Sequence, residues 1–106
     1  MSATSLANPH RGEVGLLLDG IGHMLRPTFA ALVAAEEELG PLFALVERAS
    51  GGELKLGEMV ALFWHCLAHP GDQNREAFAE AVTRAGLAAC APALRALLVQ
   101  VLKGGG

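Results

Sequence analysis

The sequence contains no tyrosine, one tryptophan and only eight lysine and arginine residues against eleven acidic ones. These cations are scattered along a chain of formal net charge −3. Proteins that bind nucleic acid without sequence preference neutralise phosphates with clustered cations, and single strands also stack on aromatic rings. The composition therefore argues against a nucleic-acid partner.

Long apolar runs and a cysteine framework are also missing. No apolar stretch reaches the roughly 20 residues of a membrane-spanning helix, and the first residues lack the basic and apolar regions of a signal peptide. The two cysteines, Cys66 and Cys90, lie within apolar helical patterns. This is typical of buried free thiols in a reducing compartment. We therefore expect a cytoplasmic protein with no membrane partner.

What the chain does have is a globular composition, with 52% hydrophobic and 18% charged residues over 106 positions. This length suits one core. The first residues are small and polar without periodicity. We expect a flexible N-terminal tail over residues 1–12, a single α+β domain over residues 13–103 and a flexible end over residues 104–106.

Residues 13–26 (EVGLLLDGIGHMLR) predict a β-hairpin that turns at Asp19-Gly20. Asp-Gly between apolar runs favours a two-residue type I′ turn, which fixes the register of the strands. The register pairs Leu18 with Ile21, Leu16 with His23 and Val14 with Leu25 on one face, and Leu17 with Gly22, Gly15 with Met24 and Glu13 with Arg26 on the other. The first face is apolar except for His23, and the second ends in opposite charges that attract across the strands.

His23 has two interpretations. We expect a packed histidine on the buried face of the hairpin. The alternative is an interface residue whose charge would make assembly sensitive to pH.

Helical spacing of apolar residues predicts helices over residues 28–39, 42–49, 57–69, 72–86 and 87–103. Thr28 is a candidate N-cap and Gly40 a stop signal, and Asp72 or Asn74 would cap the fourth helix. Pro92 predicts that the last helix begins near Ala91 or is kinked. The expected buried stripes are Phe29, Leu32, Val33 and Glu36; Leu42, Leu45 and Val46; Met59, Leu62, Phe63, Cys66 and Leu67; Phe78, Ala81, Val82 and Ala85; and Leu94, Leu97, Leu98, Val101 and Leu102.

These elements together predict an α+β fold, with an N-terminal β-hairpin packed on a small bundle of four to five helices. An isolated hairpin is marginal in water and needs a partner layer. We expect the helices over residues 28–39 and 57–69 to cover its apolar face.

One histidine pair has the spacing of metal ligands. His65 and His69 would share a helical face, as paired zinc ligands do, and His10, His23 or Cys90 would have to complete the site. The simpler interpretation is a helix end, where histidines favour the dipole and Cys66 packs in the core. We expect the simpler one, and no cofactor.

No pattern in the sequence indicates an enzyme. Glu36, Glu37 and Glu38 are consecutive and fan around a helix, so they do not converge on one substrate atom. Glu36 lies on a predicted apolar stripe and would pair with Arg26 or Arg11. There is no nucleophile with a base at a suitable spacing and no cofactor motif.

Several motifs resemble a family of small tail proteins from gene transfer agents and phages. They are Asn8-Pro9-His10-Arg11-Gly12-Glu13-Val14, the Asp-Gly hairpin, Leu25-Arg26-Pro27-Thr28-Phe29, the segment from Glu36 to Gly40, Leu56-Gly57-Glu58-Met59 and Trp64. The match covers residues 7–69 in order and spacing. Gene transfer agents are phage-like particles of alphaproteobacteria, and members of the family are described as tail tube proteins or as tail assembly chaperones.

The resemblance implies a role in tail assembly and no catalytic chemistry. Tail tubes are built from large sheets closed into a ring, whereas this chain offers one short hairpin and several helices. We therefore expect a non-enzymatic, chaperone-like assembly factor that binds tail tube or tape-measure protein, with self-association as a further expectation. Free strand edges pair with other chains, so we expect the interaction surface at Glu13, Leu17, Met24, Arg26 and Trp64.

Two alternatives stay open. The protein would be a minor structural tail component if it is retained in the particle. In another class, it would be a small cytoplasmic metal-binding or regulatory helical protein.

Overall fold

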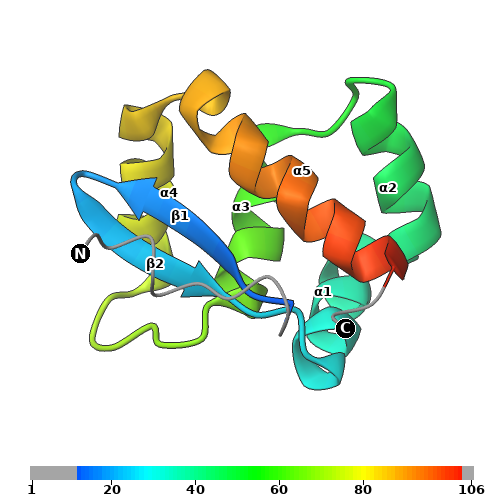
Figure 1. Ribbon diagram of the computed structural model, residues 1–106, viewed down its shortest axis with the longest axis horizontal. Coiled ribbons are helices and arrows are strands. Elements are labelled where there is room, and N and C mark those ends of the chain that lie inside the picture. Colours follow the sequence, from blue (N-terminus) through cyan, green and yellow to red (C-terminus); the bar gives the residue numbers. More distant parts are fainter. Residues whose placement is uncertain (1–11, 104–106) are drawn as a thin grey trace.

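The computed structural model describes residues 12–103 and consists of one hairpin followed by five helices (Figure 1). The strands are β1 (Val14–Leu18) and β2 (Ile21–Leu25), and the helices are α1 (Phe29–Leu39), α2 (Leu42–Ser50), α3 (Leu56–Cys66), α4 (Arg75–Ala85) and α5 (Leu87–Lys103). The predicted α+β class, a hairpin on a small helical bundle, is confirmed. The tails predicted over residues 1–12 and 104–106 lie outside the described residues except for Gly12.

The turn of the hairpin has the geometry that the sequence predicts. Asp19 and Gly20 both have positive φ, 52° and 77°, as a type I′ turn requires. The predicted register is confirmed at every pair, from Val14 with Leu25 to Leu18 with Ile21. The apolar face is the core face, although Ile21 beside the turn is 61% exposed.

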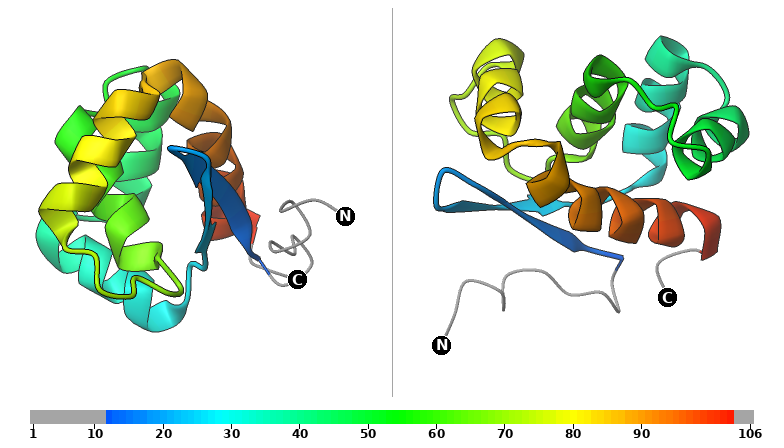
Figure 2. Two further views of the ribbon diagram at one scale, coloured as in Figure 1. Left: turned by 90° about the vertical axis from the view of Figure 1, so that its left-hand side faces the viewer. Right: turned by 90° about the horizontal axis from the view of Figure 1, so that it is seen from above.

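The hairpin does not pack as predicted. The helices that make the main contacts with β1 are α5 and α4, whereas α1 packs mainly on α3 and α2. Figure 2 (right) shows the hairpin and α5 on one side of the molecule and α1 to α4 on the other. The prediction that residues 28–39 cover the hairpin is therefore wrong. Residues 57–69 share one buried core with the apolar face of the hairpin, and their end also pairs with it, as follows.

Helix α3 ends at Cys66, not at His69 as predicted, because the next residues pair with the hairpin. Leu67 forms an antiparallel bridge with Leu25. The N–H of Ala68 donates to the carbonyl of Met24 at 2.9 Å, and the N–H of Arg26 donates to the carbonyl of Cys66 at 2.7 Å. The chain after α3 thus bonds to the outer edge of β2 through one isolated bridge and its flanking hydrogen bonds.

Capping residues begin and end the helices where the sequence indicates. The Thr28 hydroxyl accepts from the Ala31 N–H at 3.1 Å, and the Asn74 side chain accepts from the Ala77 N–H at 2.7 Å. Gly40 follows α1 with a φ of 91°, which favours glycine. Helix α5 begins at Leu87 and runs through Pro92 instead of starting near Ala91.

The core lies between the hairpin and the helices. The face of α1 that packs on this core differs from the predicted one. Ala35 is fully buried, while Phe29 is 84% and Val33 37% exposed. The residues of α1 that pack inward are Ala31, Leu32, Ala35 and Leu39. On α5, Leu97 is buried as predicted but Leu102 is 56% exposed. The predicted stripes of α2, α3 and α4 supply Leu45, Phe63 and Phe78 to the core.

Within residues 12–103, no single helix is long and apolar enough to cross a membrane. Helices α4 and α5 reach those limits of length and composition only together, as a pair bent by 113°.

Replacing a phenylalanine by alanine should destabilise the protein much more at a buried position than at an exposed one. Phe63→Ala removes a side chain with no exposed surface and should lower the free energy of unfolding by about 3–5 kcal/mol. The matched control is Phe29→Ala, which we expect to change it by about 0.5 kcal/mol or less. Urea denaturation measures both, and equal losses would contradict the packing of α1.

Candidate interaction surface

The outer face of the hairpin carries few side chains. Side chains alternate between the faces of a strand, so this face contains Glu13, Gly15 and Leu17 from one side of the hairpin and Gly22, Met24 and Arg26 from the other. Gly15 and Gly22 are exposed, and Leu17 is 64% exposed. Because the two glycines carry no side chains, the backbone beside Leu17 is exposed to solvent on this face.

The register also decides which backbone groups point away from the hairpin. Leu18 and Ile21 flank the two-residue turn and exchange both hydrogen bonds, so the alternate pairs at Leu17 and Gly15 exchange none. The N–H and C=O groups of Gly15 and Leu17 therefore point toward the outer edge of β1. Among the backbone hydrogen bonds of residues 12–103, none involves either residue at this edge.

The two edges of the hairpin are therefore unequal. The outer edge of β2 is occupied near its end, where Met24 and Arg26 bond to the chain after α3. The outer edge of β1 runs beside α5 (Figure 1) but keeps Leu17 largely exposed. Within residues 12–103, the backbone groups of Gly15 and Leu17 at this edge therefore have no backbone partner, and α5 is the element that packs beside them.

Three of the predicted interaction residues meet at the end of the hairpin away from the turn. The Arg26 guanidinium donates to the Glu13 carboxylate at 2.6 Å, which is the predicted cross-strand pair, and lies 3.6 Å from the Met24 sulfur. Glu13 is only 4% exposed, whereas the Arg26 side chain is 42% exposed. Glu13 therefore orients Arg26 and presents little surface of its own.

Trp64 lies away from this face. It is a half-buried residue of α3, and its ring is tilted against Phe78 of α4 at 5.8 Å between centroids. His23 meets the same phenylalanine edge-on at 5.9 Å. Burial lowers the pKa of His23, which favours the neutral ring. The geometry is that of the packed histidine that we expected.

An ion pair joins the tip of the hairpin to α4. The Arg84 guanidinium donates to the Asp19 carboxylate at 2.6 Å, and this hydrogen bond lowers the pKa of Asp19. Sequence analysis assigned Asp19 to the turn alone. Nothing in the local pattern links it to Arg84, which lies 65 positions further along the chain.

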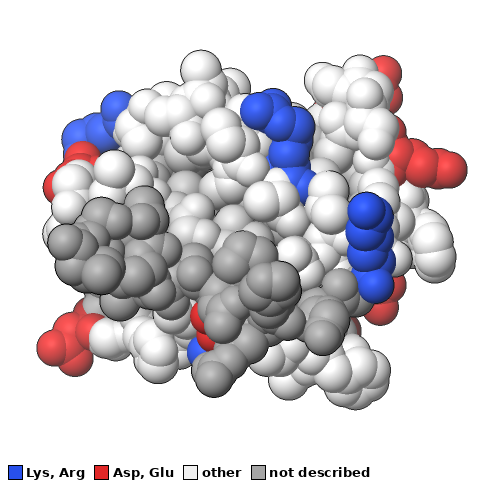
Figure 3. Space-filling model, viewed as in Figure 1, with Lys and Arg blue, Asp and Glu red and all other residues white. Residues whose placement is uncertain are grey.

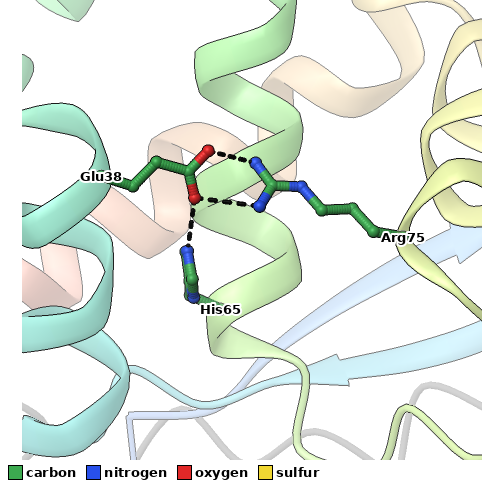
Figure 4. A network of polar contacts seen from close by, with 3 residues as sticks. All are labelled: Glu38, His65 and Arg75. Carbon is green, nitrogen blue, oxygen red and sulfur yellow. Dashed lines mark hydrogen bonds and ion pairs between the residues drawn. The ribbon is translucent and has the colours of Figure 1, made fainter.

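Glu38 links three helices in a network that sequence analysis also missed (Figure 4). Its carboxylate accepts hydrogen bonds from the Arg75 guanidinium at the start of α4, and lies 2.8 Å from Nε2 of His65 on α3. The bond from Arg75 and then that from His65 lower the pKa of Glu38 to about 2. The network fixes α1 and α4 on either side of α3.

The histidine pair does not share a helical face, because α3 ends before His69. Within residues 12–103, no group of three or more histidine, cysteine or acidic residues is placed to hold a metal ion. Cys66 is a core residue with only 1% exposed surface, and burial raises the pKa of its thiol to about 12. Glu36 accepts from the Leu42 N–H at 3.0 Å, and Arg26 bonds to Glu13 instead.

Comparison with known families places the chain among phage tail proteins. A family model described as phage tail tube protein, GTA-gp10, matches residues 11–104. Because this match covers most of the 106 residues, the chain belongs to that family. The resemblance noted in the sequence is confirmed. No curated protein and no solved structure matches the chain.

The Glu38 network should make stability depend on acid pH. Its carboxyl has a pKa of about 2 in the folded protein against an ordinary value of 4.5, so its contribution is present above pH 4.5 and is lost as the pH falls toward 2. Glu38→Gln should lower the free energy of unfolding at pH 7 by only up to about 1 kcal/mol, because the Glu38 and Arg75 side chains are 38% and 40% exposed and water screens the pair.

The difference in stability between Glu38→Gln and the native chain should shrink as the pH falls from 4.5 toward 2. Thermal unfolding followed by circular dichroism measures this difference. Glu37→Gln on the same helix is the control and should show no such trend. A constant difference from neutral pH to pH 2 would contradict the assignment.

Proposed function

We propose that the protein is a non-enzymatic tail assembly factor that holds a tail protein before it polymerises. In this proposal the client adds a strand to the outer edge of β1. The single observation that carries the proposal is the hydrogen-bonding edge at Gly15 and Leu17, which the described chain leaves without a backbone partner. Strand addition uses such an edge for affinity and exposed side chains for specificity.

Only one of the two strands of the hairpin is proposed as the client site, because part of the β2 edge is already occupied. Because the chain after α3 already bonds to Met24 and Arg26, a client strand is offered β1 and not β2. On the outer face, Leu17 supplies apolar contact and Arg26 supplies a charge held in place by Glu13. A strand with an apolar residue opposite Leu17 would fit this surface.

A non-enzymatic role agrees with the chemistry of the described residues. The carboxylate with the largest set of polar partners, Glu38, is occupied by Arg75 and His65. The Cys66 thiol has a pKa of about 12, far from that of a nucleophile. We propose that the protein acts in the cytoplasm and that its clients are the tail tube or tape-measure proteins of its own gene cluster.

A second candidate is a structural component of the tail, which the description of the family as a tail tube protein favours. The sheet in residues 12–103 has two strands, which is small for a subunit of a tube built from large sheets. Mass spectrometry of purified particles separates the candidates, because a chaperone is absent from finished tails and a structural protein is present.

Leu17→Pro tests the proposed edge. It removes the N–H that points outward and breaks no hydrogen bond to β2, so the hairpin should persist while the client loses a donor. We expect co-purification with tail tube or tape-measure protein to fall by about tenfold or more, since two or more backbone bonds depend on that edge.

The matched control is Leu17→Thr, which keeps the N–H and suits a strand, and it should retain most of the binding. Circular dichroism and urea unfolding show whether each variant is folded. A folded Leu17→Pro protein that binds its client as the native chain does would overturn the proposal.

A further inference from the structure

Helix α5 turns an apolar and cationic face to solvent. Arg95, Ala96, Val99, Leu102 and Lys103 are all exposed and recur at i, i+1, i+4, i+7 and i+8, the spacing of one helical face. Val99 is 46% and Leu102 56% exposed. The helix contains no acidic residue. In Figure 3 two cationic side chains lie over α5 with no acidic side chain between them.

Helix α1 has a matching face of opposite charge. Phe29, Ala30, Val33, Glu36 and Glu37 are exposed at the same relative positions. Phe29 is 84% and Val33 37% exposed, although phenylalanine and valine normally prefer the interior. The helix contains no lysine or arginine, and its negative dipole end lies beside the glutamates.

We propose that the outer face of α1 in one copy of the chain docks on the outer face of α5 in a second copy. Each face has a small apolar centre, at Val33 and at Val99, and the charges beside these centres are opposite. Seating Val33 on Val99 brings Glu37 to Arg95 if the helices run antiparallel, and to Lys103 if they run parallel. The alanines at position i+1 of each face allow close approach of the two helices.

The contact joins the α1 face of one copy to the α5 face of another. In a dimer, the α5 face of the first copy and the α1 face of the second therefore remain free. In the described molecule α1 packs on α3 and α2, while α5 packs on β1, α4 and α3, so both outer faces are available at once. A heterologous contact of this kind produces a closed ring or an open filament instead of a two-fold dimer. It does not use the edge of β1, so it goes beyond the proposed client site.

Charge reversal tests this contact without disturbing the core. Glu37→Lys places like charges across it, and so does Arg95→Glu or Lys103→Glu, depending on the helix direction. We expect the association constant measured by sedimentation velocity to fall by about tenfold or more for Glu37→Lys and for one of the two α5 variants. Glu80→Lys on α4 is the matched control for the change in net charge and should associate as the native chain does.

Mixing the variants gives the sharper result. The Glu37→Lys protein and the disrupted α5 variant should associate with each other, because the reversed faces are again complementary, while neither should self-associate alone. A native chain that is monomeric at millimolar concentration would overturn the contact, and so would reversed variants that self-associate like the native chain. Leu17→Pro should leave self-association unchanged, so this contact and the client site fail separately.

Discussion

The position of the hairpin depends on the backbone pairing of Leu25 with Leu67. This bridge and its two flanking hydrogen bonds tie the end of β2 to the end of α3, the most buried helix. A two-stranded hairpin is marginal in water, and the pairing extends it while its apolar face joins the core. The ion pair between Asp19 and Arg84 fixes the other end of the hairpin on α4.

This attachment gives the molecule its asymmetry. One edge of the hairpin is used to hold it on the helices, and the edge at Gly15 and Leu17 is the one where we propose that a client strand binds. Unpaired edges favour pairing with other proteins and are normally protected. Under our proposal, the partner that pairs here is a tail protein, in keeping with membership of a phage tail family. The proposed contact between copies would use a second surface, the exposed faces of α1 and α5.

Local signals in the sequence were enough to predict the hairpin and most helix ends. Asp19-Gly20 sets the register through its own backbone preferences, and Thr28 and Asn74 bond within a few residues of themselves. Features that depend on distant partners were not predictable. The periodicity of α1 indicated Phe29 and Val33 as its buried face, but the small face around Ala35 packs closely on α3. Likewise, no local signal before Pro70 ends α3, because its end is set by pairing with β2.

Hydrogen exchange at single amides, measured by NMR in the free protein and in the complex with its client, tests the central claim most directly. In the free protein, the Leu16 and Leu18 amides should exchange slowly because they bond to β2, while Gly15 and Leu17 should exchange quickly. On addition of the client, Gly15 and Leu17 should become protected. Slow exchange at these two residues in the free protein, or no change in the complex, would contradict the account.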